Sequence, residues 1–425
     1  MIERPPAPSG LVVAAMAMTM SSAFGQTYFI AIFAPQLKDE LGLTDGGFGI
    51  FYAIATIASA ATLMWGGKIA DSYRIRWPAA FALLALAAMC VAMSGVSQAW
   101  MLLPVFFGLR LFGQGTMGHL AITGVGRWYQ RRRGKMMSLA VLGFPASEAI
   151  MPFAAVTMIT MFGWRQTWLA AAGILVLVSI PLVLFLLRWE PAVPGEVGLD
   201  GQALPTRREW TRAEVVQKPE FFAVVSGIVV PSFAMTGIFF HQAHLVEVKG
   251  WSLAWFAGWF PIYAGTSVLM ALLTGWLVDR YAARRFLPYF LLPMSCGIAI
   301  LAFSDSPYAV PAFMLLGGIT NGSASTLLGA LWAELFGTRH LGAIRSLAFA
   351  GQVFASALAP GLMGLLLDLK VGIGLQFLGM VVYSVLSSLW LQMLIPRLNK
   401  IAEDGLVIGD TTDDPPAAER TGEGM

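Results

Sequence analysis

Long apolar runs separated by short polar segments dominate the chain. A helix that crosses roughly 30 Å of hydrocarbon needs about 20 mainly apolar residues, and twelve runs are long enough. Lipid offers the backbone no hydrogen-bond partners, so we expect these runs to be helical. The predicted spans are residues 11–33, 48–70, 78–97, 100–126, 136–161, 167–187, 220–245, 253–278, 287–303, 307–335, 346–368 and 375–395.

One polar turn occurs twice, 208 residues apart, and indicates an internal repeat. The segment GKIADSYRIR, which begins at Gly67, returns as GWLVDRYAAR, which begins at Gly275, with the Gly, Asp, Tyr and last Arg aligned without a gap. The same offset relates Gly42 to Gly250 and Gly143 to Gly351. Each copy contains six spans, and an even number of crossings returns the chain to the same side of the membrane. Both copies therefore have the same orientation. Parallel repeats in a membrane are typical of transporters, which place the substrate site between the halves.

Composition agrees with a membrane protein. Hydrophobic residues make up 57% of the 425 positions and charged residues only 12%, against about 25% charged residues in soluble domains. The net charge of +3 does not indicate a nucleic-acid partner, because the basic residues occupy short loops. Cys90 and Cys296 lie in apolar spans and are expected to be packing residues. No small-residue cleavage site follows MIERPPAPSG, so we expect the first span to be retained.

The loops alternate in basic charge, which predicts the orientation in the membrane. One set of loops holds twelve Lys and Arg residues and the other set only four. The richer set should be cytoplasmic, with both termini on that side of a bacterial inner (cytoplasmic) membrane. The richer set is Arg74, Arg76, Arg127, Arg131, Arg132, Arg133, Lys135, Arg280, Arg284, Arg285, Arg339 and Arg345; the poorer set is Lys38, Arg165, Lys249 and Lys370.

The polar segments divide the chain into four parts. We expect an N-terminal six-helix bundle over residues 1–187 and a second bundle over 220–395. Residues 188–219 are rich in Pro, Gly and charge and should form a cytoplasmic linker. The acidic, Pro- and Gly-rich residues 396–425 are expected to be a disordered cytoplasmic tail.

Twelve spans in two halves, with a basic G-x-x-x-D turn after spans 2 and 8, resemble the major facilitator superfamily. The resemblance implies an all-α membrane protein with twelve transmembrane helices in two parallel-repeat six-helix bundles. It also implies alternating access around a cavity lined by spans 1, 4, 7 and 10. Charge contacts in the turns would hold one face shut in one state, although the basic residues also fix topology. The expected gating residues are Gly67, Asp71, Arg76, Gly275, Asp279 and Arg284.

Two formal charges fall well inside spans, Arg110 in span 4 and Glu148 in span 5. Ionisable groups in the membrane are costly and point to function. Arg110 lies in GLRLFGQG, which resembles the fourth-helix arginine motif found in proton-coupled members of the superfamily. Two interpretations stay open for Glu148: it carries a proton through the transport cycle together with Arg110, or the two form a static buried ion pair.

Further polar residues on the expected cavity spans are candidates for substrate binding. Gln114 follows Arg110 by four residues, which places both on one helix face, whereas His119 lies about 180° away and is left open. His241 and His244 near the end of span 7 suit an outer gate or substrate hydrogen bonding, or are plain interfacial residues; too few ligands accompany them for a metal site. The substrate-binding candidates are Gln26, Tyr28, Gln114, His241, Gln242 and Asn321.

The residues also limit the chemical class of the transported solute. Span 8 has no Lys or Arg before Arg280, unlike organic-anion carriers of the superfamily, and span 5 lacks the repeated glycines of its drug/proton antiporters. Amides, imidazoles and aromatic rings suit a neutral solute with a planar part. The best single candidate is a vitamin such as riboflavin, taken up with protons. A monocarboxylate or organic-anion carrier and a drug or metabolite/proton efflux antiporter are the alternatives.

Other classes of protein fit poorly. No Gly-rich phosphate loop ending in Lys-Ser/Thr occurs, so nucleotide hydrolysis is not expected. The short loops offer no room for an enzyme site, and no cofactor or nucleic acid is expected. A receptor that binds without transport is the remaining rival. The expected partners are a small solute, protons and the lipid bilayer, with the chain as a monomer.

Overall fold

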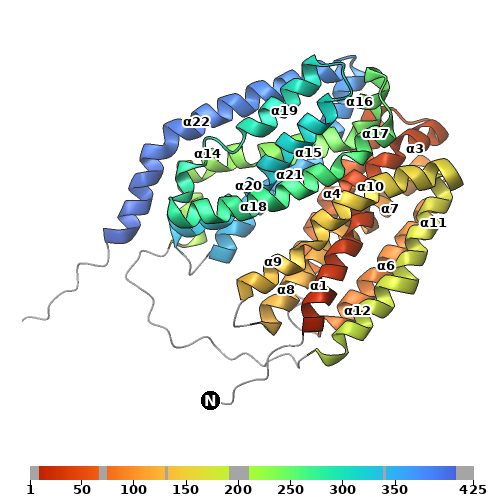
Figure 1. Cartoon of the computed structure of the whole chain (residues 1–425), viewed down its shortest axis with the longest axis horizontal. Helices are drawn as coiled ribbons and strands as arrows, with labels where there is room; N and C mark the ends of the chain where they lie inside the picture. The colour runs from red at the N-terminus through yellow and green to blue at the C-terminus, as the bar shows by residue number, and fades with distance from the viewer. Residues whose placement is uncertain (1–8, 67–73, 130–132, 191–209, 338–340, 408–425) are drawn as a thin grey trace, which may run out of the picture.

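The computed structural model describes residues 9–66, 74–129, 133–190, 210–337 and 341–407, and across them the chain forms helices and no strand. Figure 1 shows two helical bundles, the first half of the chain in red to yellow and the second half in green to blue. Eight described helices are long and apolar enough to cross a membrane, and Gly10–Gly25 and Leu292–Phe303 are shorter apolar helices. With the continuous helical segments 102–128 and 309–336, the prediction of twelve spans is confirmed.

The first half contains six spans. They are α1 (Ser9–Ser21) continued by η1 (Ser22–Gly25), α2 (Thr27–Ile30) and η2 (Ala31–Phe33); α4 (Asp45–Gly66); α6 (Arg76–Ser94); α7 (Leu102–Gly108) with the π-helix η4 (Leu109–Met117) and α8 (Gly118–Trp128); α9 (Arg133–Val141) with α10 (Gly143–Phe162); and α11 (Trp164–Ile174) with η5 (Leu175–Ser179) and α12 (Ile180–Leu186). The connecting helices are α3 (Ala34–Leu41), η3 (Ala99–Met101) and η6 (Leu187–Trp189).

The second half repeats this arrangement. Its spans are α14 (Pro219–Ile228) with α15 (Val230–Phe240); α17 (Leu253–Gly258) with α18 (Phe260–Arg280); α19 (Leu292–Phe303); α20 (Ala309–Phe336); α21 (Leu341–Asp368); and α22 (Ile373–Val407). The connecting helices are α13 (Arg212–Val216), α16 (Gln242–Lys249) and η7 (Ala283–Arg285).

Equivalent positions of the two halves adopt equivalent local structures. Gly42 ends α3 with φ 63° and Gly250 ends α16 with φ 68°, a left-handed conformation that glycine adopts without a steric penalty. The backbone N–H of Ile75 donates to Glu190 Oε1 at 2.8 Å, and that of Ala283, 208 residues later, donates to Glu334 Oε2 at 2.6 Å. In each half, a glutamate carboxylate therefore accepts a hydrogen bond from the backbone of the repeated turn.

Two adjoining irregularities, in spans 1 and 4, cannot be read from the hydrophobic pattern. The helix of span 1 breaks at Gln26, whose backbone is extended (φ −84°, ψ 150°). Span 4 is a π-helix from Leu109 to Met117, and such segments are frequent at functional sites. The two segments touch, because a Cβ on Gly25 would lie only 2.2 Å from the carbonyl oxygen of Leu109.

The end of the second half corrects one expectation. Residues 396–407, which we expected to be disordered, continue α22 as a helix to Val407. Leu398 and Ala402 are buried, and Asn399 accepts a hydrogen bond from Arg284. Apolar packing and this contact outweigh the polar composition of the segment. The remainder of the predicted tail lies outside the described residues.

The two halves meet at one end of the molecule, which we call the closed end. It carries α3 and α16, and there α4 packs on α21 and α10 packs on α17 and α18. The N–H of Gly46 donates to Asp368 Oδ2 at 3.1 Å, and the ring of Phe240 lies 4.8 Å from that of Tyr52. Figure 1 shows the bundles separating toward the opposite end, where α8, α9 and α14 lie; we call it the open end.

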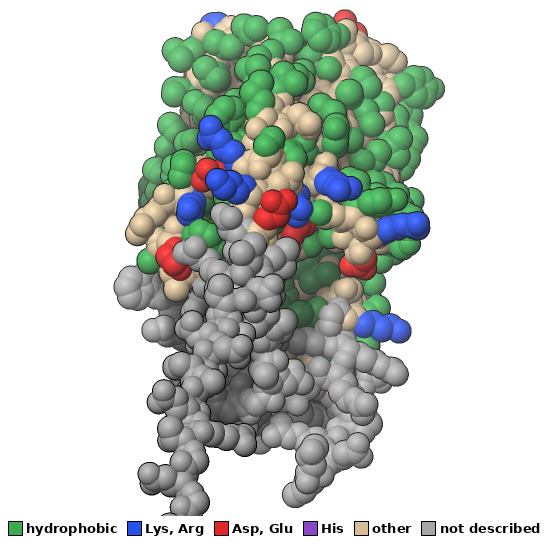
Figure 2. Space-filling model, turned by 90° about the vertical axis from the view of Figure 1, so that its left-hand side faces the viewer, with side chains coloured by type: hydrophobic (Ala, Val, Ile, Leu, Met, Phe, Trp, Pro, Cys, Tyr) green, Lys and Arg blue, Asp and Glu red, His purple; other side chains and the backbone are tan. Residues whose placement is uncertain are grey.

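The outer surface fits a membrane-spanning fold. Large apolar side chains such as Leu177, Phe303 and Met393 are more than two-thirds exposed, which lipid contact explains. Figure 2, which looks from the left-hand side of Figure 1, shows most of the charged side chains in a band across the middle of the view and mainly hydrophobic side chains above it.

Candidate functional site

A cavity of about 650 Å³ lies between the two halves. It runs from Tyr28 and Phe239, next to the closed end, to Trp332 and Arg345 at the open end. This volume is typical of sites for small organic ligands. The polar side chains that line it are Gln26, Thr27, Tyr28, Gln114, Glu148, Ser232, Thr236, Tyr263, Asn321, Ser325, Arg345, Ser346 and Gln352.

The first half contributes two amides to the cavity wall. Gln26 lies at the helix break, with Nε2 donating to Ser22 Oγ at 3.3 Å, and Gln114 lies on the π-helix. Tyr28 follows, with its hydroxyl 3.0 Å from Ser147 Oγ. The structure therefore brings these three predicted candidates to one cavity.

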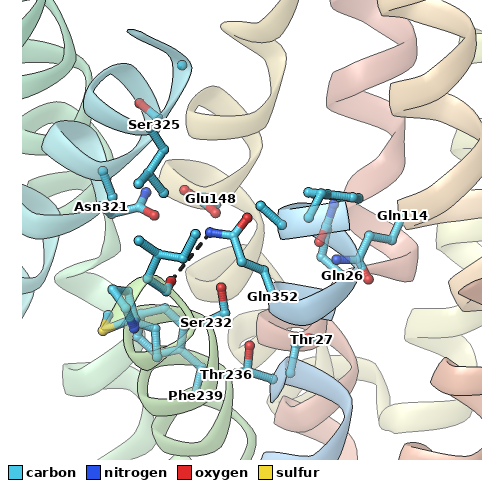
Figure 3. A pocket seen from close by; sticks show the side chains of 18 of the residues that line it. Gln26, Thr27, Gln114, Glu148, Ser232, Thr236, Phe239, Asn321, Ser325 and Gln352 are labelled. Atoms are coloured by element: carbon cyan, nitrogen blue, oxygen red, sulfur yellow. Dashed lines mark hydrogen bonds between the residues drawn. The ribbon is translucent and has the colours of Figure 1, made fainter. Parts of the chain in front are cut away.

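The second half provides the facing wall. Asn321 Nδ2 donates to Ser267 Oγ at 3.2 Å, which orients its amide. Gln352 Nε2 donates to the carbonyl oxygen of Ile228 at 3.5 Å. Figure 3 shows the Gln26–Gln114 pair and Asn321 on opposite sides of the cavity. The sequence reasoning missed Gln352 because it lies on span 11, which was not among the expected cavity spans; a lone amide in an apolar run was the available signal.

Glu148 supplies the carboxylate of the cavity. It lies on α10 and is half-buried, between Asn321 and the Gln26–Gln114 pair in Figure 3. Among the described residues, no Lys, Arg or His lies within 4.0 Å of its oxygens. An unpaired carboxylate in a membrane-embedded cavity is either protonated or bound to a solute for part of the cycle.

Arg110 does not line the cavity, although its four-residue spacing from Gln114 places both on one helix face. Its side chain is 3% exposed, donates to the carbonyl oxygen of Gly25 at 3.1 Å and lies over the ring of Tyr52 at 5.2 Å. No ion pair joins it to Glu148 in this conformation. Side chains of a helix tilt toward its N-terminus, so Arg110 points toward the closed end, while Gln114, one turn later, reaches the cavity.

His241 and Gln242 also lie outside the cavity lining, contrary to their selection as substrate-binding residues. Both are buried at the closed end. Gln242 Nε2 donates across the two halves to the carbonyl oxygen of Tyr28 at 3.2 Å, and His241 Nε2 lies 3.0 Å from that of Pro360. Of the options that the sequence left for His241, its position agrees with an outer gate. His119 is not among the cavity residues either.

The described members of the expected gating set, Arg76, Gly275, Asp279 and Arg284, fall at the open end. Gly67 and Asp71 lie outside the described residues. Arg284 bonds Glu334 and Asn399, all within the second half. The guanidinium of Arg76 lies 5.2 Å from the ring of Trp77, and Asp279 is exposed near the end of α18, which also contains Gly275. None of these contacts joins the two halves, so a gating role stays a prediction.

The comparisons with known proteins identify the family. The family model of the Major Facilitator Superfamily matches residues 15–267 and 257–405. The chain belongs to this superfamily. It is therefore a multi-pass membrane transporter of small solutes and not an enzyme.

Individual relatives are distant. The chain is 25% identical over 372 residues to a 38 kDa protein of the 23S RNA operon of Thermoproteus tenax, covering 85% of this chain and 88% of that protein. It is 23% identical over 370 residues to the MFS-type transporter YcxA of Bacillus subtilis (strain 168), with 82% and 85% covered. It is 23% identical over 219 residues to the oxalate:formate antiporter of Oxalobacter formigenes, which covers 50% and 49% of the two chains.

Solved structures show the same fold. A bacterial homologue of the human lysosomal transporter Spinster, crystallised in an inward-facing and unoccupied conformation, has a TM-score of 0.75 at 14% identity, with 94% of this chain and 99% of that chain covered. A mutant of the nucleoside transporter NupG has a TM-score of 0.63 at 14% identity, with 92% and 99% covered.

The amide of Gln114 offers a first test of the cavity. Replacing Gln114 with Ala removes a hydrogen-bonding group from the wall, so we expect the KM for the transported solute to rise about tenfold, the effect of one lost hydrogen bond of about 1.4 kcal/mol. Gln166→Ala, at an exposed glutamine outside the cavity, is the matched control and should leave KM unchanged. An unaltered KM for Gln114→Ala would remove Gln114 from the binding site.

Proposed function

We propose that the protein is a proton-coupled secondary transporter that takes up a small, uncharged organic solute by alternating access. The observation that carries this proposal is Glu148, a carboxylate without a basic partner among the described residues, in a cavity lined by four amides. A carboxylate in this position binds a proton from one side of the membrane and releases it to the other as the two halves rock.

The cavity wall favours a solute with a planar part and several polar edges. The amides of Gln26, Gln114, Asn321 and Gln352 offer both donors and acceptors. Aromatic rings of Tyr28, Tyr263 and Phe239 lie at the deep end and suit stacking. A vitamin such as riboflavin has these features and is the solute to test first.

A carrier of organic anions is the second candidate. It is favoured by the similarity of half of the chain to an oxalate:formate antiporter. Among the described residues of the cavity, the one cationic side chain is Arg345, which is exposed at the open end, and Arg110 lies outside the lining. The centre of the cavity therefore offers an anion no described cationic partner, which favours an uncharged solute.

Orientation and direction are part of the proposal. Described residues of the basic loops, such as Arg76, Arg284 and Arg345, lie at the open end. We therefore place that end and both termini in the cytoplasm of a bacterium, with the chain in its inner membrane. The structure then corresponds to a cytoplasm-open state, from which an importer releases its solute. In drug or metabolite efflux the same conformational cycle would move the solute in the opposite direction, out of the cell.

Uptake by cells that express the protein tests the proposal. The panel contains labelled riboflavin, other vitamins, short carboxylic acids and amino acids, each with and without a protonophore. Accumulation of riboflavin or another uncharged solute that collapses with the protonophore supports it. Accumulation of a carboxylate would replace the proposed solute class with organic anions. Reduced retention of a preloaded compound would establish export. Binding of a solute without its transport would indicate that the protein acts as a receptor.

A further inference from the structure

Titratable side chains from both halves meet at the closed end. Asp45 begins α4 in the first half, and its Oδ1 lies 3.8 Å from Nδ1 of His241 in the second half. Its Oδ2 lies 3.6 Å from Nδ1 of His244. Nζ of Lys38, in the first half, lies 2.7 Å from Oδ1 of Asp45. The proposed function does not use this cluster.

The hydrogen bond of His241 determines which ring nitrogen carries a proton in the neutral form. His241 Nε2 lies 3.0 Å from the carbonyl oxygen of Pro360. A carbonyl oxygen only accepts, so Nε2 must donate and must carry hydrogen. The neutral ring then directs the lone pair of Nδ1 toward the Asp45 carboxylate, which is unfavourable. A second proton, on Nδ1, turns this contact into an ion pair.

The surrounding charges favour that second proton. Among the described residues, the charged and titratable groups near Asp45 and His241 are Lys38 and Asp39 on α3, His244 and Glu247 on α16, and Asp368 on α21, which accepts from the N–H of Gly46. Four carboxylates, including Asp45, thus lie near one ammonium group. In α16, beyond the spanning helix, partial burial lowers the pKa of His244 although Asp45 opposes the shift. Geometry singles out His241, because its Nε2 is held by the carbonyl oxygen of Pro360 while its Nδ1 faces the Asp45 carboxylate.

The partners of this proton come together only when the closed end is shut. Asp45 belongs to the first half, whereas His241 and Pro360 belong to the second. Separation of α4 from α21 would remove the carboxylate from Nδ1 and leave the Pro360 contact intact. A surface hollow of about 480 Å³, lined by Lys38, His244 and Glu247 among others, lies at the same end. It brings solvent to Lys38 and His244 at the edge of the cluster, whereas His241 is buried behind them.

We propose that His241 is a second proton-binding site, which fills when this end of the transporter closes and empties when it opens. A proton that binds one conformation more tightly shifts the equilibrium toward it. One such proton changes the ratio of closed to open ends by up to about tenfold per pH unit. The sign follows from His241 gaining a partner on closure: closure is favoured at low pH and loses this stabilisation as pH rises. The inference depends on alternating access and not on the identity of the solute or on Glu148.

Distance measurements between spin labels across the closed end test the proposal without any solute. The labels are attached to Gln166→Cys in the first half and Val248→Cys in the second, and both positions are exposed. The exposed Cys296 is replaced with Ser so that it takes no label, whereas the buried Cys90 is kept. The protein is held in lipid nanodiscs between about pH 5 and pH 8. We expect the population with the short distance to fall steeply as pH rises.

Three variants identify the group. The variants are made in the Glu148→Gln background, so that the proposed coupling carboxylate cannot contribute to the titration. His241→Gln keeps an N–H for Pro360 but binds no proton, so its distance distribution should not change with pH. Asp45→Asn should give the same result if His241→Gln does not fold. His244→Gln is the matched control and should titrate like the wild type. A wild type without pH dependence, a His241→Gln variant that still titrates, or loss of the titration in His244→Gln would overturn the assignment. Glu148→Gln should still titrate, which separates this site from the proposed coupling site.

Discussion

Replacing Glu148 with Gln is expected to abolish uphill accumulation while leaving exchange of labelled for unlabelled solute intact. The amide keeps the size and polarity of the side chain but cannot carry a proton. One charge moved across 100 mV is worth about 2.3 kcal/mol, which corresponds to about fifty-fold accumulation. The variant should therefore equilibrate the solute at a ratio near one. Uptake into proteoliposomes with an imposed proton gradient measures the loss, and counterflow measures the exchange.

The matched control for this experiment is Gln352→Glu in the Glu148→Gln background. Gln352 lines the same cavity from the second half, so the change restores a carboxylate at a different place. Partial recovery of accumulation would show that the cavity needs a titratable carboxylate and not Glu148 specifically. Full accumulation by the single variant Glu148→Gln would exclude Glu148 from coupling.

Replacing Gly49 with Ala is expected to prevent the closed end from shutting. A Cβ at Gly49 would lie 2.3 Å from the carbonyl oxygen of Pro360 and 3.0 Å from Cα of Gly361, and both are backbone atoms that cannot rotate away. Overpacking of this kind costs about 1–3 kcal/mol, which lowers the ratio of closed to open ends roughly 5- to 150-fold. Turnover should fall because the cycle must pass through this state. The spin-label distance across the closed end should lengthen.

Gly379→Ala is the matched control, because a Cβ at that helical position of α22 meets nothing within 4 Å. It should transport like the wild type and should be slightly more stable, since Ala favours the helix. Wild-type turnover and distances in Gly49→Ala would contradict the view that close backbone contact between α4 and α21 seals this end.

The sequence predicted the fold well because the membrane imposes simple rules. Helices that span it must be about 20 mainly apolar residues long, and the duplicated turn at Gly67 and Gly275 indicates two halves. Both rules depend on composition and spacing, which a sequence displays directly. The end of α22 was missed because its packing depends on partners such as Arg284, which lies more than a hundred residues away.

The sequence by itself determined the membrane class, the twelve spans, the repeat and the likeness to the superfamily. It also singled out Gln26, Gln114, Glu148 and Asn321, because a polar side chain in an apolar span is conspicuous. Only the tertiary structure decided which of these groups meet. Arg110 turns away from Glu148, and His241 lies at the closed end beside Asp45. The direction of a side chain depends on breaks in its helix, on the tilt of the helix and on the relative position of the two halves. The hydrophobic pattern of the sequence contains no information on any of these three.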